Sequence, residues 1–110
     1  MSAASPTRFA FLTNHAQVLL CIAGDPGLRL REIGAEVGIT ERAAHRIVGE
    51  LEAAGYVTRQ REGRRNRYTI EPHLQLPDRI AREQQVVDLL AIVAGAGRAV
   101  EGVGSQERAI

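Results

Sequence analysis

Apolar positions recur at helical spacing in the middle of the chain, and the pattern predicts two amphipathic helices at about 31–37 and 41–54. In the first of these, Ile33 and Val37 lie one turn apart and so share a face. In the second, apolar side chains recur at spacings of three and four, at Ala44, Ile47 and Leu51. Each helix is therefore expected to bury one face and to present the other to solvent.

The residues that join these two helices suit a tight turn. Gly38 can adopt a positive φ at no steric cost, and Ile39 is placed to fill the gap between the helices. Thr40 can cap the second helix by accepting a hydrogen bond from a free backbone N–H. Gly34 faces the crossing, where the absence of a side chain lets two backbones approach closely, and Gly55 follows the second helix as its C-terminal turn residue. We therefore expect a compact pair of crossing helices.

A nearly all-apolar segment precedes this pair of helices. It predicts a helix from Thr13 or Asn14, as N-cap, to about Ala23. Because apolar side chains cover nearly its whole circumference, this helix is expected at the centre of the domain. Residues 24–27 predict a turn, and residues 28–30 are expected to form a short strand that leads into the next helix.

After Gly55 the pattern changes to one that is typical of a β-hairpin. Residues 56–61 and 66–70 are rich in residues with high β-propensity, and residues 62–65 link them as a turn. This segment contains five arginines and a single acid, whereas the formal net charge of the whole chain is only +1. The concentration of positive charge in one hairpin indicates contact with a polyanion. The five arginines are Arg59, Arg61, Arg64, Arg65 and Arg67.

A last helix is expected from about residue 79 to residue 94, with Asp78 as its cap. Its second half is apolar on more than one side, so it needs two partners, its own domain and a second subunit. Residues 1–8 and the glycine-rich residues 95–110 are expected to be disordered or flexible. The residues expected to pair two subunits are Val86, Leu89, Leu90 and Val93.

The order of these elements resembles that of the winged helix-turn-helix transcriptional regulators, and most nearly the small MarR-like regulators of bacteria. The resemblance covers about residues 11–70 and rests mainly on the stretch LREIGAEVGITERAAHRIVGELEAAGYVTRQREGRRNRYTI. It implies a mainly α fold with a small β-hairpin wing, in which residues 9–72 form a DNA-binding domain and residues 73–94 a C-terminal dimerisation helix. The extra N-terminal dimerisation helix of full-length MarR proteins is expected to be missing.

The resemblance implies that the helix at 41–54 enters the major groove of DNA and that the wing reaches an adjacent groove or the backbone. The amphipathic pattern agrees, because Arg42 and Arg46 lie four apart on the outward face and can fork onto guanine or phosphate. At the tip of the wing, Arg64 and Arg65 can enter a narrow minor groove. The residues expected to contact DNA are Thr40, Glu41, Arg42, His45, Arg46, Arg59, Arg61, Arg64, Arg65, Asn66 and Arg67.

These features predict a sequence-specific regulator of transcription that binds double-stranded DNA as a homodimer and acts as a repressor. Two alternatives stay open. A winged-helix module can dock on another protein without specific DNA binding. A thiol- or metal-responsive regulator would act through Cys21, although its position mid-helix among apolar residues favours an inert core thiol. The sequence assigns no small-molecule effector.

Other classes of function are disfavoured by what the sequence lacks. The three histidines, His15, His45 and His73, are far apart, and no spacing of Cys, His and acidic residues suits a metal site. No nucleophile–base pair or phosphate-binding glycine loop is present, so neither an enzyme nor a cofactor is expected. A single cysteine excludes an intramolecular disulfide, and no apolar run is long enough to span a bilayer, so the expected location is the cytoplasm.

Overall fold

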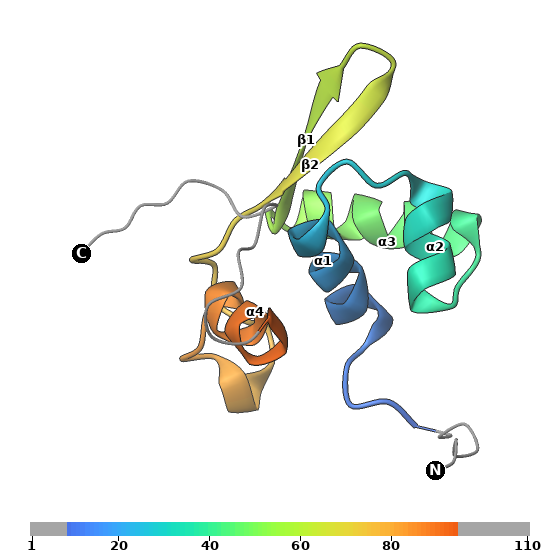
Figure 1. The fold of residues 1–110 in the computed structure, drawn as a ribbon. Coiled ribbons are helices and arrows are strands. Elements are labelled where there is room, and N and C mark those ends of the chain that lie inside the picture. The colour runs from blue at the N-terminus through green and yellow to red at the C-terminus, as the bar shows by residue number, and fades with distance from the viewer. Residues whose placement is uncertain (1–8, 95–110) are drawn as a thin grey trace.

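The computed structural model describes residues 9–94, and the expectations of disorder or flexibility for residues 1–8 and 95–110 lie outside the described residues. Helices dominate, and one antiparallel hairpin projects from them (Figure 1). The predicted class, mainly α with a small β-hairpin, is confirmed. In chain order the elements are α1 (Asn14–Gly24), α2 (Leu30–Val37), α3 (Glu41–Ala53), β1 (Val57–Glu62), β2 (Arg65–Ile70), the 3-10 turn η1 (Arg79–Ala81) and α4 (Val86–Ala94).

Helix α1 lies at the centre of the molecule, as its apolar circumference predicts. It contacts α2, α3, β2 and α4, and the side chains of Val18 and Ile22 have no exposed surface. Ile33 of α2, Ile47 of α3 and Ile70 of β2 belong to the same buried cluster. Burying an aliphatic side chain of this size stabilises the fold by about 1.5–3 kcal/mol. The core therefore joins every element that positions the outer face of α3.

The turn between α2 and α3 has the geometry that its residues predict. Gly38 has a φ of 90°, and the backbone N–H groups of Gly38 and Ile39 both donate to the carbonyl oxygen of Gly34 at 2.8 Å. Thr40 Oγ1 accepts a hydrogen bond from the backbone N–H of Ala43 at 3.0 Å and so caps α3. A Cβ on Gly34 would lie 2.7 Å from the carbonyl oxygen of Ile39, so the crossing leaves no room for a side chain there.

The hairpin pairs β1 with β2 from Val57 opposite Ile70 to Glu62 opposite Arg65. Its turn consists of two residues, Gly63–Arg64, rather than the four that the sequence predicts. Gly63 has a φ of 63°, and two-residue hairpin turns favour glycine because they require a positive φ. The short turn places Arg64 at the very tip.

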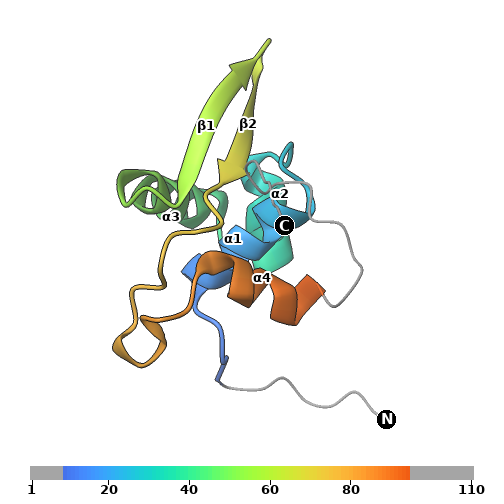
Figure 2. The same ribbon diagram turned by 90° about the vertical axis from the view of Figure 1, so that its left-hand side faces the viewer.

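The base of the hairpin is anchored, while its tip extends into solvent. Val57, Tyr68 and Ile70 are buried at the base. The backbone N–H of Tyr68 also donates to the carbonyl oxygen of Pro26 at 3.0 Å, which ties β2 to the loop before α2. Figures 1 and 2 show both strands rising away from the helices toward the turn.

The short strand predicted for residues 28–30 is wrong. Leu30 already belongs to α2, and the sheet in the described part of the chain has two strands. Glu32 explains why a helix forms here: its carboxylate accepts a hydrogen bond from the backbone N–H of Arg29 at 2.8 Å. This bond occupies a donor at the helix start and favours α2 over a strand.

The continuous helix predicted for residues 79–94 is also wrong. The chain forms only the short turn η1 and then an irregular segment before α4 begins at Val86. Backbone hydrogen bonds from Leu76 to the carbonyl of Gln84, and from Val86 to the carbonyl of Leu74, fold this segment back on itself at 2.9 Å each. Asp78 makes no side-chain cap bond, and α4 itself has nine residues. Among residues 9–94, no helix has the length and apolar character needed to cross a bilayer.

Candidate nucleic-acid interface

The outward face of α3 begins at its cap and carries polar side chains through the first two turns. Thr40, Arg42, His45 and Arg46 are exposed and line a shallow hollow of about 390 Å³. Glu41, the remaining residue predicted for this helix, is exposed at the helix start. The five residues that the sequence predicts on this helix thus lie together on the surface.

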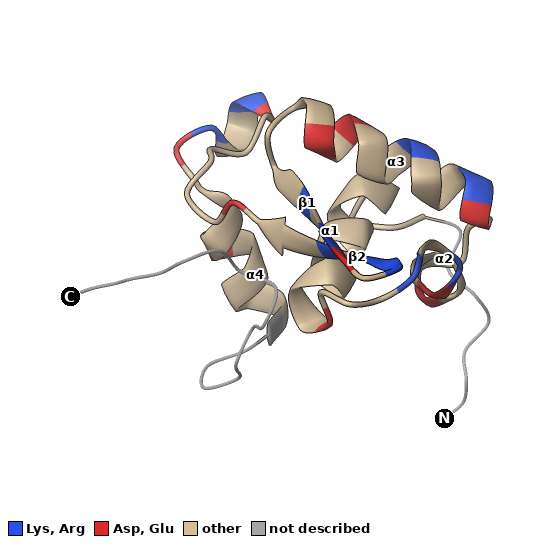
Figure 3. Ribbon diagram, turned by 90° about the horizontal axis from the view of Figure 1, so that it is seen from above, with Lys and Arg blue, Asp and Glu red and all other residues tan. Residues whose placement is uncertain are grey.

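Charge is divided along α3. The helix begins with the acid Glu41, and beyond it Figure 3 shows basic residues on the first half and acidic residues on the second half. Arg46 Nη1 lies 3.2 Å from Glu50 Oε2, and His15 Nε2 of α1 lies 2.6 Å from the other oxygen of the same carboxylate. Hydrogen bonds from His15 and then from Arg46 hold the pKa of Glu50 below its usual value. Arg46 is therefore oriented along the helix by a carboxylate that is itself tied to α1.

The arginines of the hairpin differ in how they are held. Arg59 pairs with Glu52 of α3 at 3.3 Å, and Arg61 Nε donates to the carbonyl oxygen of Gly63 at 3.2 Å. The guanidinium of Arg65 donates to the carbonyl oxygen of Gly27. No ion pair among residues 9–94 involves Arg64. Arg67 is exposed and Asn66 is half-buried.

A second hollow, of about 290 Å³, separates the hairpin from the start of α2. Arg64, Arg65 and Asn66 line it from the hairpin, and Arg29 and Arg31 line it from the start of α2. The sequence pattern did not single out the last two residues. In the sequence they are marked only as two arginines on either side of Leu30. The hairpin that brings other arginines next to them lies more than 30 residues further along the chain.

The comparisons with known proteins agree with this geometry. A model of the MarR family matches residues 11–67, which is more than half of the chain. The chain belongs to the MarR family. A solved structure of a MarR family protein from Mycobacterium tuberculosis, in complex with salicylic acid, is 26% identical to it and matches it with a TM-score of 0.50. That match covers 74% of this chain and 58% of the relative, and no curated protein matches the chain significantly.

MarR proteins are DNA-binding regulators of transcription, and membership of the family supports a function of this class for the chain, which is proposed below. The predicted family and the predicted winged helix-turn-helix fold are thereby confirmed. In MarR terms, α2 and α3 form the helix-turn-helix and the β1–β2 hairpin is the wing. The chain spans 58% of the length of the solved relative.

The apolar residues of α4 in this MarR protein are distributed differently from the prediction. Val86 and Leu90 are buried in the core of their own chain, with 0% and 3% exposure, so the expectation that they present apolar surface to a second subunit is wrong. Leu89 is half-buried, and Val93 is 49% exposed. Ile92, which the prediction omitted, is 79% exposed. The periodicity identified an apolar helix but assigned its two faces incorrectly.

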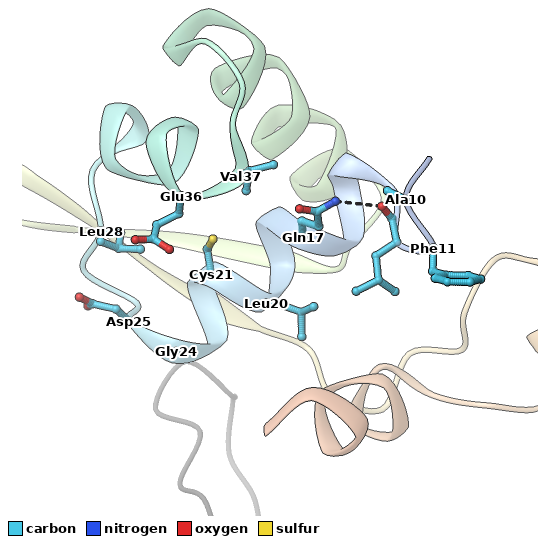
Figure 4. A pocket seen from close by; sticks show the side chains of 11 residues that line it. Ala10, Phe11, Gln17, Leu20, Cys21, Gly24, Asp25, Leu28, Glu36 and Val37 are labelled. Carbon is cyan, nitrogen blue, oxygen red and sulfur yellow. Dashed lines mark hydrogen bonds between the residues drawn. The ribbon is translucent and has the colours of Figure 1, made fainter. Parts of the chain in front are cut away.

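Cys21 lies in the wall of a hollow of about 770 Å³, beside Leu20, Leu28 and Glu36 (Figure 4). Burial, and next the negative charge of Glu36, raise the pKa of the thiol. A raised pKa keeps the thiol protonated at neutral pH, which makes it a poor nucleophile and a poor metal ligand. Among residues 9–94, no three His, Cys, Asp or Glu side chains are grouped closely enough to hold a metal ion.

Proposed function

We propose that this MarR protein is a repressor that binds double-stranded DNA as a homodimer. The observation that carries the proposal is that the start of α3 and the tip of the arginine-rich wing lie next to each other, since Glu41 of α3 and Arg64 and Arg65 of the wing line the same hollow. In this arrangement α3 enters the major groove while the wing follows the adjacent backbone or minor groove. The proposed contacts are Thr40, Glu41, Arg42, His45, Arg46, Arg59, Arg61, Arg64, Arg65, Asn66 and Arg67.

The proposed contacts differ in role. Arg42 has no ion-pair partner among residues 9–94, so its guanidinium is available for a bidentate contact with a guanine. Arg64, at the tip of the wing, is available for the minor groove in the same way. Arg59 and Arg46 are each neutralised in part by a glutamate of α3, so we assign them weaker roles.

The proposed homodimer rests on the exposed side of α4. Ile92 and Val93 are exposed on one flank of the buried positions that hold α4 on its own domain, and Val87 is exposed on the other flank, about 140° from Ile92 around the helix. Pairing α4 with its symmetry mate would cover this apolar surface in a two-fold interface. Two recognition helices would then reach successive major grooves about 34 Å apart.

We do not propose that this chain binds salicylic acid, the ligand of the solved relative. The hollow beside Cys21 contains the acids Asp25 and Glu36, and none of the residues within 9–94 that line it is an arginine or a histidine. A carboxylate ligand placed there would meet negative charge.

The test is the salt dependence of binding to duplex DNA, compared between wild type, Arg64→Ala and the control Arg82→Ala. Arg82 is also an exposed arginine, and it directly follows η1. The segment that joins η1 to α4 lies at the opposite end of the molecule from the wing (Figure 1). We expect the Arg64 variant to weaken binding to all duplexes and to flatten the log–log salt slope by about one unit. The Arg82 variant should match wild type. Salt-independent or absent binding by wild type would favour the protein-interaction module instead.

A further inference from the structure

We propose that the hollow between the start of α2 and the wing seats a backbone phosphate of the bound DNA. The inference rests on the proposed DNA binding and adds to it a site that the start of α2 forms together with the wing. Its new residues are Arg29 and Arg31, which the amphipathic pattern of the sequence leaves unassigned. The ligand is a phosphodiester of duplex DNA.

The charge of the hollow carries the argument. Four arginines from two separate elements line it, against one acid, Glu41. No ion pair among residues 9–94 involves Arg29, Arg31 or Arg64, so the positive charge of these three is not neutralised within the described part of the protein. Cations gathered around one opening repel each other, and an anion in that opening relieves the repulsion.

The backbone around the hollow favours an anion as well. Helix α2 has eight residues and begins at Leu30, and Leu30 and Arg31 line the opening. The carboxylate of Glu32 already accepts from the N–H of Arg29, so the N–H groups that follow Arg29 are the ones that remain without a partner within the helix. These groups carry the partial positive charge of a helix N-terminus. On the opposite wall, the bond from Arg65 to the carbonyl oxygen of Gly27 fixes one guanidinium in place before any ligand arrives.

The position of the hollow selects DNA phosphate over other anions. Its lining includes Glu41, the first residue of α3, and Arg64, the tip of the wing, so it lies between the two elements that are proposed to enter the grooves. A duplex that contacts both must pass its backbone over the opening.

The experiment compares Arg29→Ala/Arg31→Ala with the charge-matched control Arg79→Ala/Arg82→Ala. Both pairs remove two exposed arginines, but the control pair lies in and just after η1. For fluorescein-labelled duplexes of random sequence, we expect the first pair to flatten the log–log salt slope by about one unit and the control pair to leave it unchanged. The loss should be equal on random and preferred sequences, because phosphate contacts carry no sequence information. Arg31→Ala alone serves if the double variant loses its cooperative thermal unfolding.

The outcomes separate this inference from the proposed function. If wild type shows no salt-dependent binding, the proposed function fails. If wild type binds but the two variant pairs have the same slope, DNA binding stands and the phosphate site is refuted. A further measurement is the unfolding temperature in the presence of inorganic phosphate. If phosphate raises the unfolding temperature of wild type but not of Arg29→Ala/Arg31→Ala, while the DNA slope stays unchanged, the hollow is a site for a small anion and the inference is overturned.

Discussion

At the scale of single residues, two glycines of the helix-turn-helix have opposite surroundings. Gly34 faces two backbone carbonyls, since a Cβ there would lie 2.7 Å from the oxygen of Ile39 and 3.2 Å from that of Thr40. Neither atom belongs to a flexible side chain that could move aside. We expect Gly34→Ala to lower the free energy of unfolding by about 1–3 kcal/mol, the usual cost of overpacking, as measured by urea denaturation.

Gly49 provides the matched substitution within the same motif. It lies in the middle of α3 on the exposed side, and a Cβ there would meet nothing within 4 Å. Because glycine is disfavoured in a helix interior relative to alanine, Gly49→Ala should raise the free energy of unfolding by about 0.5–1 kcal/mol. Urea denaturation that gave the two alanine variants the same sign of change would contradict the crossing geometry described for Gly34.

The sequence could predict residues whose roles are steric and local. Gly38, Gly34 and Thr40 act on neighbours within a few positions, so their roles follow from residue type and spacing. Arg29 and Arg31 could not be placed in the same way, because their cluster exists only once the wing has folded back beside α2. Functional residues that are brought together by tertiary structure leave no periodic signal.

At the scale of elements, the bonds of His15 and Arg46 to Glu50 join α1 to α3. These bonds favour the ionised carboxylate, so the pKa of Glu50 is lower in the folded protein than in the unfolded chain. The resulting stability is present above the unfolded pKa, near 4.5, and is lost as the pH falls through the lower folded value. Urea titrations should therefore show the difference between wild type and Glu50→Gln shrinking from pH 5.5 to pH 3. A difference that grew over this range would contradict the assigned bonds.

The same scale shows where pattern reading fails. Helices α1, α2 and α3 begin and end within a residue or so of their predicted limits, because their caps and glycines are encoded next to them. The break before α4 is encoded elsewhere, in backbone bonds to Leu74 and Leu76 that compete with helix formation. The local spacing of apolar residues contains no information on such bonds, so it predicted one helix where the structure has η1 and α4.

At the scale of the whole molecule, the buried residues of α4 stabilise the fold, and its exposed apolar residues are the ones proposed to pair two subunits. Leu90 is 3% exposed, so Leu90→Ala should cost about 2–5 kcal/mol of stability through loss of burial and the cavity left behind. Ile92 is 79% exposed, so Ile92→Glu should leave the monomer folded and place two like charges in the proposed interface. Light scattering at low micromolar concentration should give a dimer for wild type and a 12.0 kDa monomer for Ile92→Glu. A monomeric wild type would refute the homodimer.

The division of charge along α3 also has a consequence for the rate at which the protein would associate with the proposed DNA. After the initial Glu41, Arg42 and Arg46 precede Glu50 and Glu52 on the same helix (Figure 3). Arg64 and Arg65 of the wing lie next to the start of this helix, since they share a hollow with Glu41. This separation is a permanent dipole, which experiences a torque in the field of a polyanion before any contact forms. That field reaches only about 10 Å at 0.1 M ionic strength, so the torque acts during the last moments of diffusion. In the proposed encounter with DNA, collisions that begin with the acidic end of α3 foremost would be turned or repelled, and a larger share of encounters would become productive.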